Sequence, residues 1–296
     1  MRGREQGVIR PHEDPELFRE AVNFTSASTG FLPRLIEKDY FSSLALDYLV
    51  ASDDSLVFKG GTCLAKVYAG FYRLSEDLDF AISASVDSSR AERSRLAAGV
   101  KKALRSLASV ISSFRIVAPL EGANNSTQYT SVIAYASLLS RQEERIRIEV
   151  GLREPLFLPV TETAADTILL DPVSNEPMVA AIRPRCMSKM EVFAEKFRAA
   201  LSRREVAIRD FFDIDHGVRR LGIQPQDERL IRLVKAKLAV PGNEPLNVSE
   251  GRLVLLRQQV STELKPVLRD SDFREFDLER AFRLVADMAT RLGVHR

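Results

Sequence analysis

The sequence predicts an α/β (α+β) protein in which a lobe built on a mixed sheet precedes a helical C-terminal lobe. Three observations predict this class. Segments with strand-like alternation or short apolar runs occur before about residue 151. Beyond Cys186 almost every segment has the apolar periodicity of helices. Residues 153–184, which join the two parts, hold five prolines and are typical of loops. We therefore expect two domains, residues 1–184 and 185–296.

The composition is that of an ordinary globular protein. The 296 residues suit about two domains, and 43 basic against 41 acidic residues give a net charge of only +2. This charge is too small to imply nucleic-acid binding by itself. Cys63 and Cys186 lie far apart in the sequence, which argues against a disulfide framework and favours the reducing cytoplasm. The charged residues 1–13 do not form a signal peptide, and the long uncharged stretch 122–140 is too polar to span a membrane.

The first lobe is expected to mix helices and strands. A proline opens each of the first two helical patterns, and proline suits the first turn of a helix. Alternation of polar and apolar residues indicates the strands. In order, we expect helices over 15–24 and 33–49, a strand over 56–58, a helix over 62–68, a strand over 77–82, a long amphipathic helix over 89–112, and strands over 114–117, 128–136 and 145–150.

The second lobe is expected to be helical throughout. Ser188 and Glu191 have the spacing of a capping box, in which each side chain bonds the other residue's backbone N–H. The expected helices cover 188–202, 206–220, 227–239, 249–268, where Pro266 is a possible break, and 277–292. Residues 183–220 have a local net charge of +4, which suits an RNA acceptor but also fits a salt-bridged helical surface.

A pair of glycines follows the first predicted strand. Gly60 and Gly61 would form the turn into a helix that begins near Thr62. Two glycines let the backbone approach a ligand closely, and the N–H groups at a helix N-terminus suit a phosphate. Most such pairs are only turns, however, so this feature needs support from other residues.

That support comes from carboxylates on neighbouring strands. Asp77 and Asp79 are two residues apart and would project from one face of a strand. Adjacent carboxylates repel each other unless a cation neutralises them, and Mg²⁺ prefers such oxygen ligands. In the alternating segment 145–150, Glu149 lies on the polar face and could supply a third carboxylate. Solvated surface aspartates, and a salt bridge of Glu149, are the plainer alternatives.

These motifs together resemble the nucleotidyltransferase superfamily, and most of all the AbiEii-type toxins, which include MenT-like proteins. The central segment is Gly60-Gly61-Thr62 followed by Arg73-x-Ser75-x-Asp77-x-Asp79. Four further segments fit the same family: Glu37-Lys38-Asp39-Tyr40, Ile148-Glu149-Val150, Glu195-Lys196-Phe197-Arg198-Ala199 and Arg209-Asp210-Phe211-Phe212-Asp213. The resemblance covers residues 37 to about 215 and implies a nucleotidyltransferase-like fold for the first lobe. Thr62 and Glu149 stand where the family often has serine and aspartate, but both keep the required chemistry.

The resemblance also implies roles for individual residues. Asp77, Asp79 and Glu149 would bind Mg²⁺, and Lys196, which lies in the apolar arc of its helix, would contact the nucleotide's phosphates. Asp210 and Asp213 are one helical turn apart and could hold Lys196 or Arg209, or help to activate the acceptor hydroxyl. The implied catalytic residues are Asp77, Asp79, Lys196 and Asp210, and the implied nucleotide-binding residues are Gly60, Gly61, Thr62, Arg73, Ser75 and Lys196.

The activity implied is metal-dependent transfer of a nucleotide from an NTP to an acceptor hydroxyl, with release of pyrophosphate. In this family the expected acceptor is the 3′ end of tRNA, and the expected partner is the antitoxin of a type IV toxin–antitoxin or abortive-infection system. Two alternatives remain. One is a nucleotidyltransferase that modifies a small molecule such as an antibiotic, and the other is a non-catalytic nucleotide-binding protein.

Overall fold

A computed structural model describes residues 10–293, and in this range the strands form one seven-stranded mixed sheet. The strand order is β3-β4-β5-β2-β1-β7-β6, so β1 and β2 lie in the middle, although they come first in the chain. The bounds are β1 Val57–Lys59, β2 Leu78–Ala81, β3 Phe114–Ala123, β4 Gln128–Ala136, β5 Glu143–Gly151, β6 Thr161–Glu162 and β7 Arg185–Cys186.

The pairing of the central strands places three charged residues in one row. Strand β1 pairs with β2 in the antiparallel sense and sets Lys59 opposite Asp79. Strand β5 pairs with β2 in the parallel sense and sets Glu149 opposite Asp79. Directly paired residues on adjacent strands project from the same face. The sheet register therefore brings together two charged groups, Asp79 and Glu149, that are 70 residues apart in the sequence.

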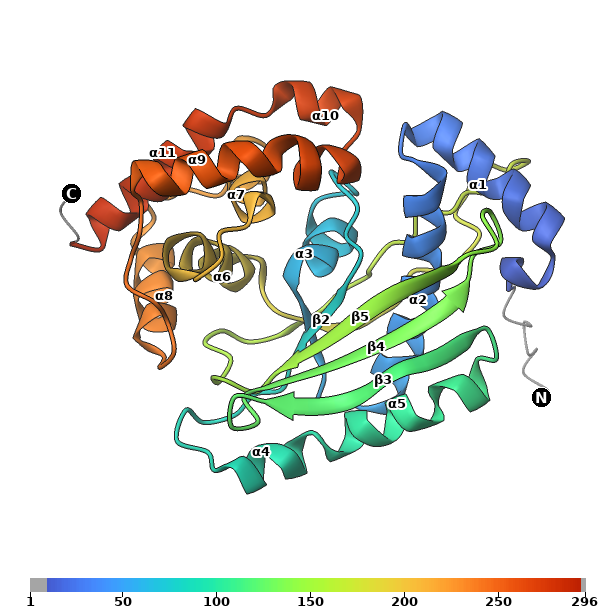
Figure 1. The fold of residues 1–296 in the computed structure, drawn as a ribbon, viewed down its shortest axis with the longest axis horizontal. Helices are drawn as coiled ribbons and strands as arrows, with labels where there is room; N and C mark the ends of the chain where they lie inside the picture. Colours follow the sequence, from blue (N-terminus) through green and yellow to red (C-terminus); the bar gives the residue numbers. More distant parts are fainter. Residues whose placement is uncertain (1–9, 294–296) are drawn as a thin grey trace.

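The helices fall into two groups (Figure 1). Helices α1, α2, α4 and α5 accompany the sheet, whereas α6 to α11 gather on the other side of β2, with α3 between the groups. The helices cover α1 Pro15–Thr29, α2 Pro33–Ser52, α3 Gly60–Cys63, α4 Arg90–Leu96, α5 Ala98–Val110, α6 Lys189–Ser202, α7 Ile208–Arg220, α8 Glu228–Ala239, α9 Glu250–Gln259, α10 Asp270–Glu275 and α11 Leu278–Arg291. None of these helices combines the length and apolar character that crossing a bilayer requires, within residues 10–293.

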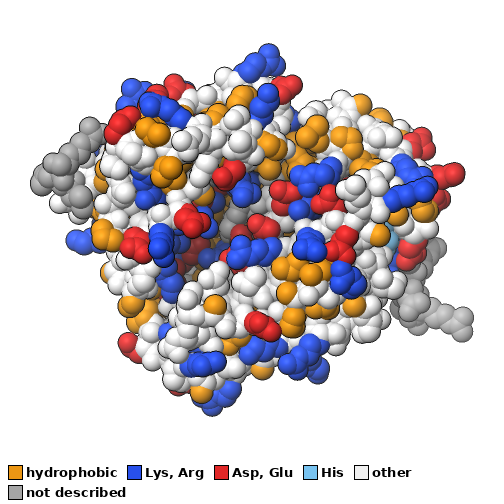
Figure 2. Space-filling view, viewed as in Figure 1, with side chains coloured by type: hydrophobic (Ala, Val, Ile, Leu, Met, Phe, Trp, Pro, Cys, Tyr) orange, Lys and Arg blue, Asp and Glu red, His pale blue; other side chains and the backbone are white. Residues whose placement is uncertain are grey.

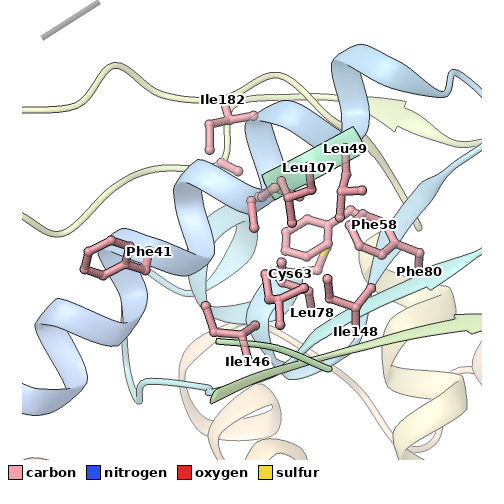
Figure 3. Close-up of a cluster of buried hydrophobic side chains, with 14 of the residues drawn as sticks. Phe41, Leu49, Phe58, Cys63, Leu78, Phe80, Leu107, Ile146, Ile148 and Ile182 are labelled. Carbon is pink, nitrogen blue, oxygen red and sulfur yellow. The ribbon is translucent and has the colours of Figure 1, made fainter. Parts of the chain in front are cut away.

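Two apolar cores correspond to these groups. In the first, buried side chains of the sheet, among them Phe58, Phe80 and Ile148, pack against α2 and α5 (Figure 3). In the second, α6, α7 and α11 pack together with side chains from the central strands, such as Val57 and Ala81. The central strands β1 and β2 thus contribute to both cores. This arrangement fixes the row of charged residues between the two groups of helices.

Buried polar contacts hold α2 against the rest of the first lobe. The Glu37 carboxylate is fully buried and accepts hydrogen bonds from the Ser137 hydroxyl and the Leu138 backbone N–H, both at 2.7 Å. Asp39 binds the buried Lys66 ammonium at 2.7 Å. Glu37 and Asp39, both in the Glu-Lys-Asp-Tyr segment, therefore have structural partners.

Several sequence predictions need correction. The helix expected over 89–112 is two helices, α4 and α5, because Ala97 leaves the helical backbone conformation. The helix expected over 249–268 ends as α9 at Gln259 and continues as a five-residue π turn and a short 3₁₀ turn that contains Pro266. Helix α10 was not anticipated. The segment 62–68 begins as α3 two residues earlier than expected and continues as a π turn over Leu64–Tyr68.

The capping box expected at Ser188 is only half present. The Ser188 hydroxyl accepts from the Glu191 N–H, as expected. The Glu191 side chain instead accepts from the backbone N–H groups of Phe157 and Leu158 and binds Lys237 at 3.0 Å. A complete capping box is found at Ser89. The tertiary partners of Glu191 therefore replace the local partner that the spacing predicted.

The buried pair Asp39–Lys66 gives a test of the fold. Lys66→Met should lower the free energy of unfolding by about 3–5 kcal/mol, because it leaves the Asp39 carboxylate buried without its cation. The double variant Asp39→Leu/Lys66→Met should recover most of this loss. Urea denaturation of the three chains measures both effects, and equal stability of wild type and Lys66→Met would show that the pair does not stabilise the fold.

Candidate active site

The two glycines after β1 form a tight turn against two functional side chains. Gly60 has a φ of +75°, which an L-residue rarely adopts, and a side chain there would clash with the Asp79 carboxylate. A side chain at Gly61 would clash with the Arg73 guanidinium. Glycine is therefore required at both positions for the carboxylate and the guanidinium to lie directly on the turn.

Asp79 lies in β2, whereas Asp77 immediately precedes this strand, which is shorter than the expected 77–82; neither carboxylate forms an ion pair among residues 10–293. Burial raises the pKa of both carboxyl groups, and the neighbouring Glu149 raises them further. For Asp79 the resulting pKa is about 6, even though Lys59 and Lys196 act in the opposite direction. Arg209, Lys38 and Arg147 likewise oppose the rise at Asp77, so burial outweighs the surrounding positive charge at both carboxyl groups.

Glu149 lies beside Asp79 in the sheet but has partners of its own. Its carboxylate binds the Arg147 guanidinium at 2.7 Å and accepts a hydrogen bond from the Gln128 amide at 3.0 Å. In the part of the chain that the structure describes, no three His, Cys, Asp or Glu side chains converge on a common metal position. The oxygen donors of Asp77 and Asp79 nevertheless fit a hard divalent cation, because their charge is unmatched. The three-carboxylate metal site stays a prediction.

Lys196 is held in a buried network of charges. Its ammonium lies 2.8 Å from a carboxylate oxygen of Asp210 and 2.8 Å from one of Asp213. Asp213 also receives two hydrogen bonds from the Arg73 guanidinium, at 2.6 and 2.8 Å, and one from the Tyr72 hydroxyl. Despite full burial, Arg73 and Lys196 hold the pKa of Asp213 well below its usual value. Both aspartates thus position Lys196, which was one of the roles that the sequence left open for them.

The predicted phosphate-binding residues are brought to one place but differ in accessibility. Thr62 is buried, and its hydroxyl donates to the backbone carbonyl of Asp77. Arg73 is buried in its pair with Asp213. Ser75 is partly exposed beside Gly61. Thr62 and Arg73 therefore support the loop that bears Asp77. Gly61 is buried as well, whereas Gly60 and Ser75 are partly exposed and accessible to a ligand.

The Glu-Lys-Asp-Tyr segment reaches the site through its lysine. Lys38 binds Glu76 at 3.1 Å, and Arg34 binds the same carboxylate at 3.0 Å. Although burial opposes ionisation, Lys38 and Arg34 hold the pKa of Glu76 below its usual value. Because Glu76 precedes Asp77 in the chain, helix α2 anchors the loop on which the aspartates depend.

A cavity of about 740 Å³ opens at Asp79 and Glu149. Figure 2 shows the hollow on this face between α6 and the sheet, bordered by charged side chains. Its basic lining residues are Lys59, Arg153, Arg198, Arg204 and Lys237, and its acidic ones are Asp79, Glu149, Glu154, Glu195 and Glu244. The cavity is therefore lined by both signs of charge and has room for a ligand of nucleotide size.

Sequence reasoning missed the lysines of this cavity. Lys59 binds Glu195 at 2.9 Å, and Lys237 binds Glu154, Glu191 and Glu195 at 3.0 to 3.4 Å. Although burial opposes ionisation, Lys59 and Lys237 hold the pKa of Glu195 below its usual value. The available signal was Lys237 itself, which lies on the apolar face of α8 and needs a buried anion.

Comparison with known proteins identifies a family. The family described as "Nucleotidyl transferase AbiEii toxin, Type IV TA system" matches residues 44–289. None of the curated proteins matches the chain. Two solved structures from Helicobacter pylori are similar. One is JHP933, with 17% identity, a TM-score of 0.45, and 92% of this chain and 91% of that chain covered. The other, provisionally described as a nucleotidyltransferase, has 18% identity, a TM-score of 0.43, and coverage of 94% and 99%.

The two aspartates of α7 should differ in their contribution to stability. Asp213→Asn should lower the free energy of unfolding by about 3–5 kcal/mol, because it leaves the buried Arg73 without its carboxylate. Asp210→Asn should cost no more than about 2 kcal/mol, since Lys196 keeps Asp213. Urea denaturation of both variants measures the difference. Equal losses would contradict a central position of Asp213 in the network.

The raised pKa of Asp79 predicts a pH-dependent stability. Its folded-state pKa of about 6 exceeds the unfolded value of 3.8, so between these values only the folded chain keeps the proton. The free energy of unfolding should fall as the pH rises from about 4 to about 6, by at most about 3 kcal/mol. Asp79→Asn removes this loss, so without metal at pH 7 the variant should be the more stable chain.

The measurement is the difference in unfolding free energy between wild type and Asp79→Asn, taken at several pH values in EDTA. Asp87→Asn, an exposed aspartate in the turn after β2, is the matched control and should track the wild type. A difference that does not change between pH 4 and pH 7 would mean that the Asp79 pKa is not raised.

Proposed function

Because the chain belongs to the AbiEii nucleotidyltransferase toxin family of type IV toxin–antitoxin systems, we propose that it transfers a nucleotide from an NTP to the 3′ hydroxyl of an RNA, with tRNA as the expected acceptor. The new bond joins the acceptor oxygen to the α-phosphorus of the NTP. The bond that breaks joins the α-phosphorus to the oxygen that bridges to the β-phosphate, so pyrophosphate leaves. The proton of the hydroxyl leaves with solvent or base, so atoms and charge balance. A cognate antitoxin, which the family implies, is the expected protein partner.

One observation carries the proposal most directly. Asp79 lines a cavity large enough for a nucleotide, and neither it nor Asp77, two residues earlier, forms an ion pair among residues 10–293. A protein that used these residues only for folding would pair them, as it pairs Asp39 and Asp213. The unpaired negative charge of the two aspartates supports a function in which they bind a cation that is not part of the protein.

Magnesium is the cation that this donor set favours, since it binds one or two carboxylates together with substrate phosphates. Asp77 and Asp79 would hold it, with Glu149 as the third candidate ligand. When bound, such an ion neutralises phosphate charge and lowers the pKa of an acceptor hydroxyl.

The residues of the chain would act mainly by positioning. The Gly60–Gly61 turn allows a phosphate to approach the backbone N–H groups, and the Ser75 hydroxyl lies at the same turn. Lys196 adds a positive charge whose place is fixed by Asp210 and Asp213. Positioning and electrostatic stabilisation account for most of the catalysis of phosphoryl and nucleotidyl transfer.

The choice of RNA as acceptor rests on the family and on basic side chains without anions. Arg204 is exposed at the cavity, and Arg209 lies close enough to lower the pKa of Asp77. Neither forms an ion pair among residues 10–293. Such side chains suit the phosphodiesters of an RNA strand.

The decisive experiment labels the product. The purified chain is incubated with each α-labelled NTP, Mg²⁺ and total RNA, and the labelled product is sized. We expect label on RNA of tRNA length with the wild type, and a loss of at least about a thousandfold with Asp79→Asn, because the metal ligand is removed. Expression of the wild type alone should also arrest bacterial growth, whereas Asp79→Asn should not.

Asp87→Asn is the matched control and should label RNA at the wild-type rate. Mg²⁺ should raise the melting temperature of the wild type and leave that of Asp79→Asn unchanged. Label found only on small molecules would favour an antibiotic-type acceptor. Growth arrest that persists with Asp79→Asn, without any transfer, would instead favour the non-catalytic alternative.

A further inference from the structure

Two arginines that line the cavity form no ion pair in the part of the chain that the structure describes. Arg153 and Arg198 both line it, and the Nε–H of each is buried without a hydrogen-bond acceptor in residues 10–293. A buried donor left unsatisfied costs free energy, and charged donors cost the most. The two acids that raise the pKa of Arg153, Glu154 and Glu195, each bind Lys237, and the second carboxylate oxygen of Glu154 is also buried without a partner.

The two arginines also oppose each other. Burial lowers the pKa of Arg153, and the positive charge of Arg198 lowers it further, although arginine stays protonated. Lys59 and Lys237, the two lysines of the same cavity, have carboxylates within 3.4 Å. Glu154 and Glu195 act on Arg153 in the opposite direction, but within residues 10–293 neither arginine forms a direct ion pair, whereas both lysines do.

Arg153 is held in place despite the missing anion. One of its terminal nitrogens donates to the Asn243 side-chain oxygen at 3.0 Å. The Asn243 amide nitrogen donates to the backbone carbonyls of Lys237, Leu238 and Val240, at 2.8 to 2.9 Å. The loop after α8 therefore fixes Arg153 before any ligand binds, as expected of a binding residue rather than a mobile surface side chain.

The position of the pair relative to the carboxylates suits one kind of ligand. Glu149, which lies beside Asp79, and Arg153 are four residues apart at the end of β5. At a rise of 3.3 Å per residue they are separated by at most about 13 Å along the chain. A nucleoside triphosphate is long enough to span this separation, so a polyphosphate bound at the arginine pair would leave its α-phosphate within reach of the carboxylates.

We propose that Arg153 and Arg198 bind the polyphosphate of the incoming nucleotide, and so orient it with its α-phosphate toward Asp77 and Asp79. This assignment rests on the proposed function for the identity of the ligand. A pair of guanidinium groups suits a compact, highly charged anion, which each can bind through two parallel hydrogen bonds. A phosphodiester of RNA carries less charge at one point and suits the pair less well.

The test uses inorganic tripolyphosphate as the probe, with the full chain in EDTA so that no metal contributes. Isothermal titration calorimetry should give binding to the wild type. Arg153→Met and Arg198→Met should each weaken it at least about tenfold, and the double variant at least about a hundredfold. Arg232→Met, an exposed arginine paired with Glu228, is the control and should bind as the wild type does.

The melting temperature without ligand gives a second measurement. Arg198→Met should melt at the same or a higher temperature than the wild type, because it removes an unsatisfied charge. Tripolyphosphate should raise the melting temperature of the wild type and not that of the double variant. A purely structural role would produce the opposite pattern, in which the variants melt lower and bind tripolyphosphate normally.

Two results would overturn the assignment. One is equal binding of tripolyphosphate by the wild type and the double variant, or no binding by the wild type. The other is a double variant that still binds tripolyphosphate but has lost affinity for a single-stranded oligoribonucleotide. This result would indicate that the two arginines bind the RNA acceptor. Neither result bears on Asp79→Asn, so failure of this assignment remains separate from failure of the proposed function.

Discussion

The carboxylate of Asp213 is the contact on which the arrangement of the site depends. It lies on α7 and binds Arg73 and Tyr72, which come from the loop between α3 and β2, as well as Lys196 from α6. These partners belong to segments up to 141 residues apart in the sequence. A buried carboxylate with three donors has little freedom to move, so the helical lobe and the aspartate-bearing loop are fixed relative to each other.

The distribution of charge follows a simple division. Groups that hold the fold are paired in the interior, as Asp39 is with Lys66 and Asp213 with Arg73. Some groups that line the cavity are paired as well, such as Lys59 with Glu195, but Asp79 of β2 and the two arginines Arg153 and Arg198 form no ion pair in the described residues. Unpaired buried charge lowers stability, and proteins keep it where a ligand completes the site. The carboxylate and the two arginines have opposite charges, as a metal and a polyphosphate require.

The same division explains why motif residues do not share one role. Thr62 and Arg73 belong to the segment that resembles the nucleotidyltransferases, yet both are buried and support the loop around Asp77. Lys38 supports the same loop indirectly, because it binds Glu76, the residue that precedes Asp77. Some residues of a motif therefore hold a reactive group in place, whereas others are free to contact a ligand. Burial and hydrogen-bond partners tell the two apart.

The sequence by itself determined the order of most elements, the two glycines, the aspartate pair and the family. These features are local, because a strand's alternation or a turn's glycines depend on neighbouring residues. The tertiary structure decided among the alternatives that the sequence left open for Glu149 and for Asp213, by setting Glu149 opposite Asp79 and Asp213 against Lys196. It alone showed the arginine pair. Each depends on sheet register or on helix packing between distant segments. No local pattern encodes which carboxylate a buried cation will contact. The Glu191 side chain, which the sequence assigns to the capping box of Ser188, therefore binds Lys237 instead.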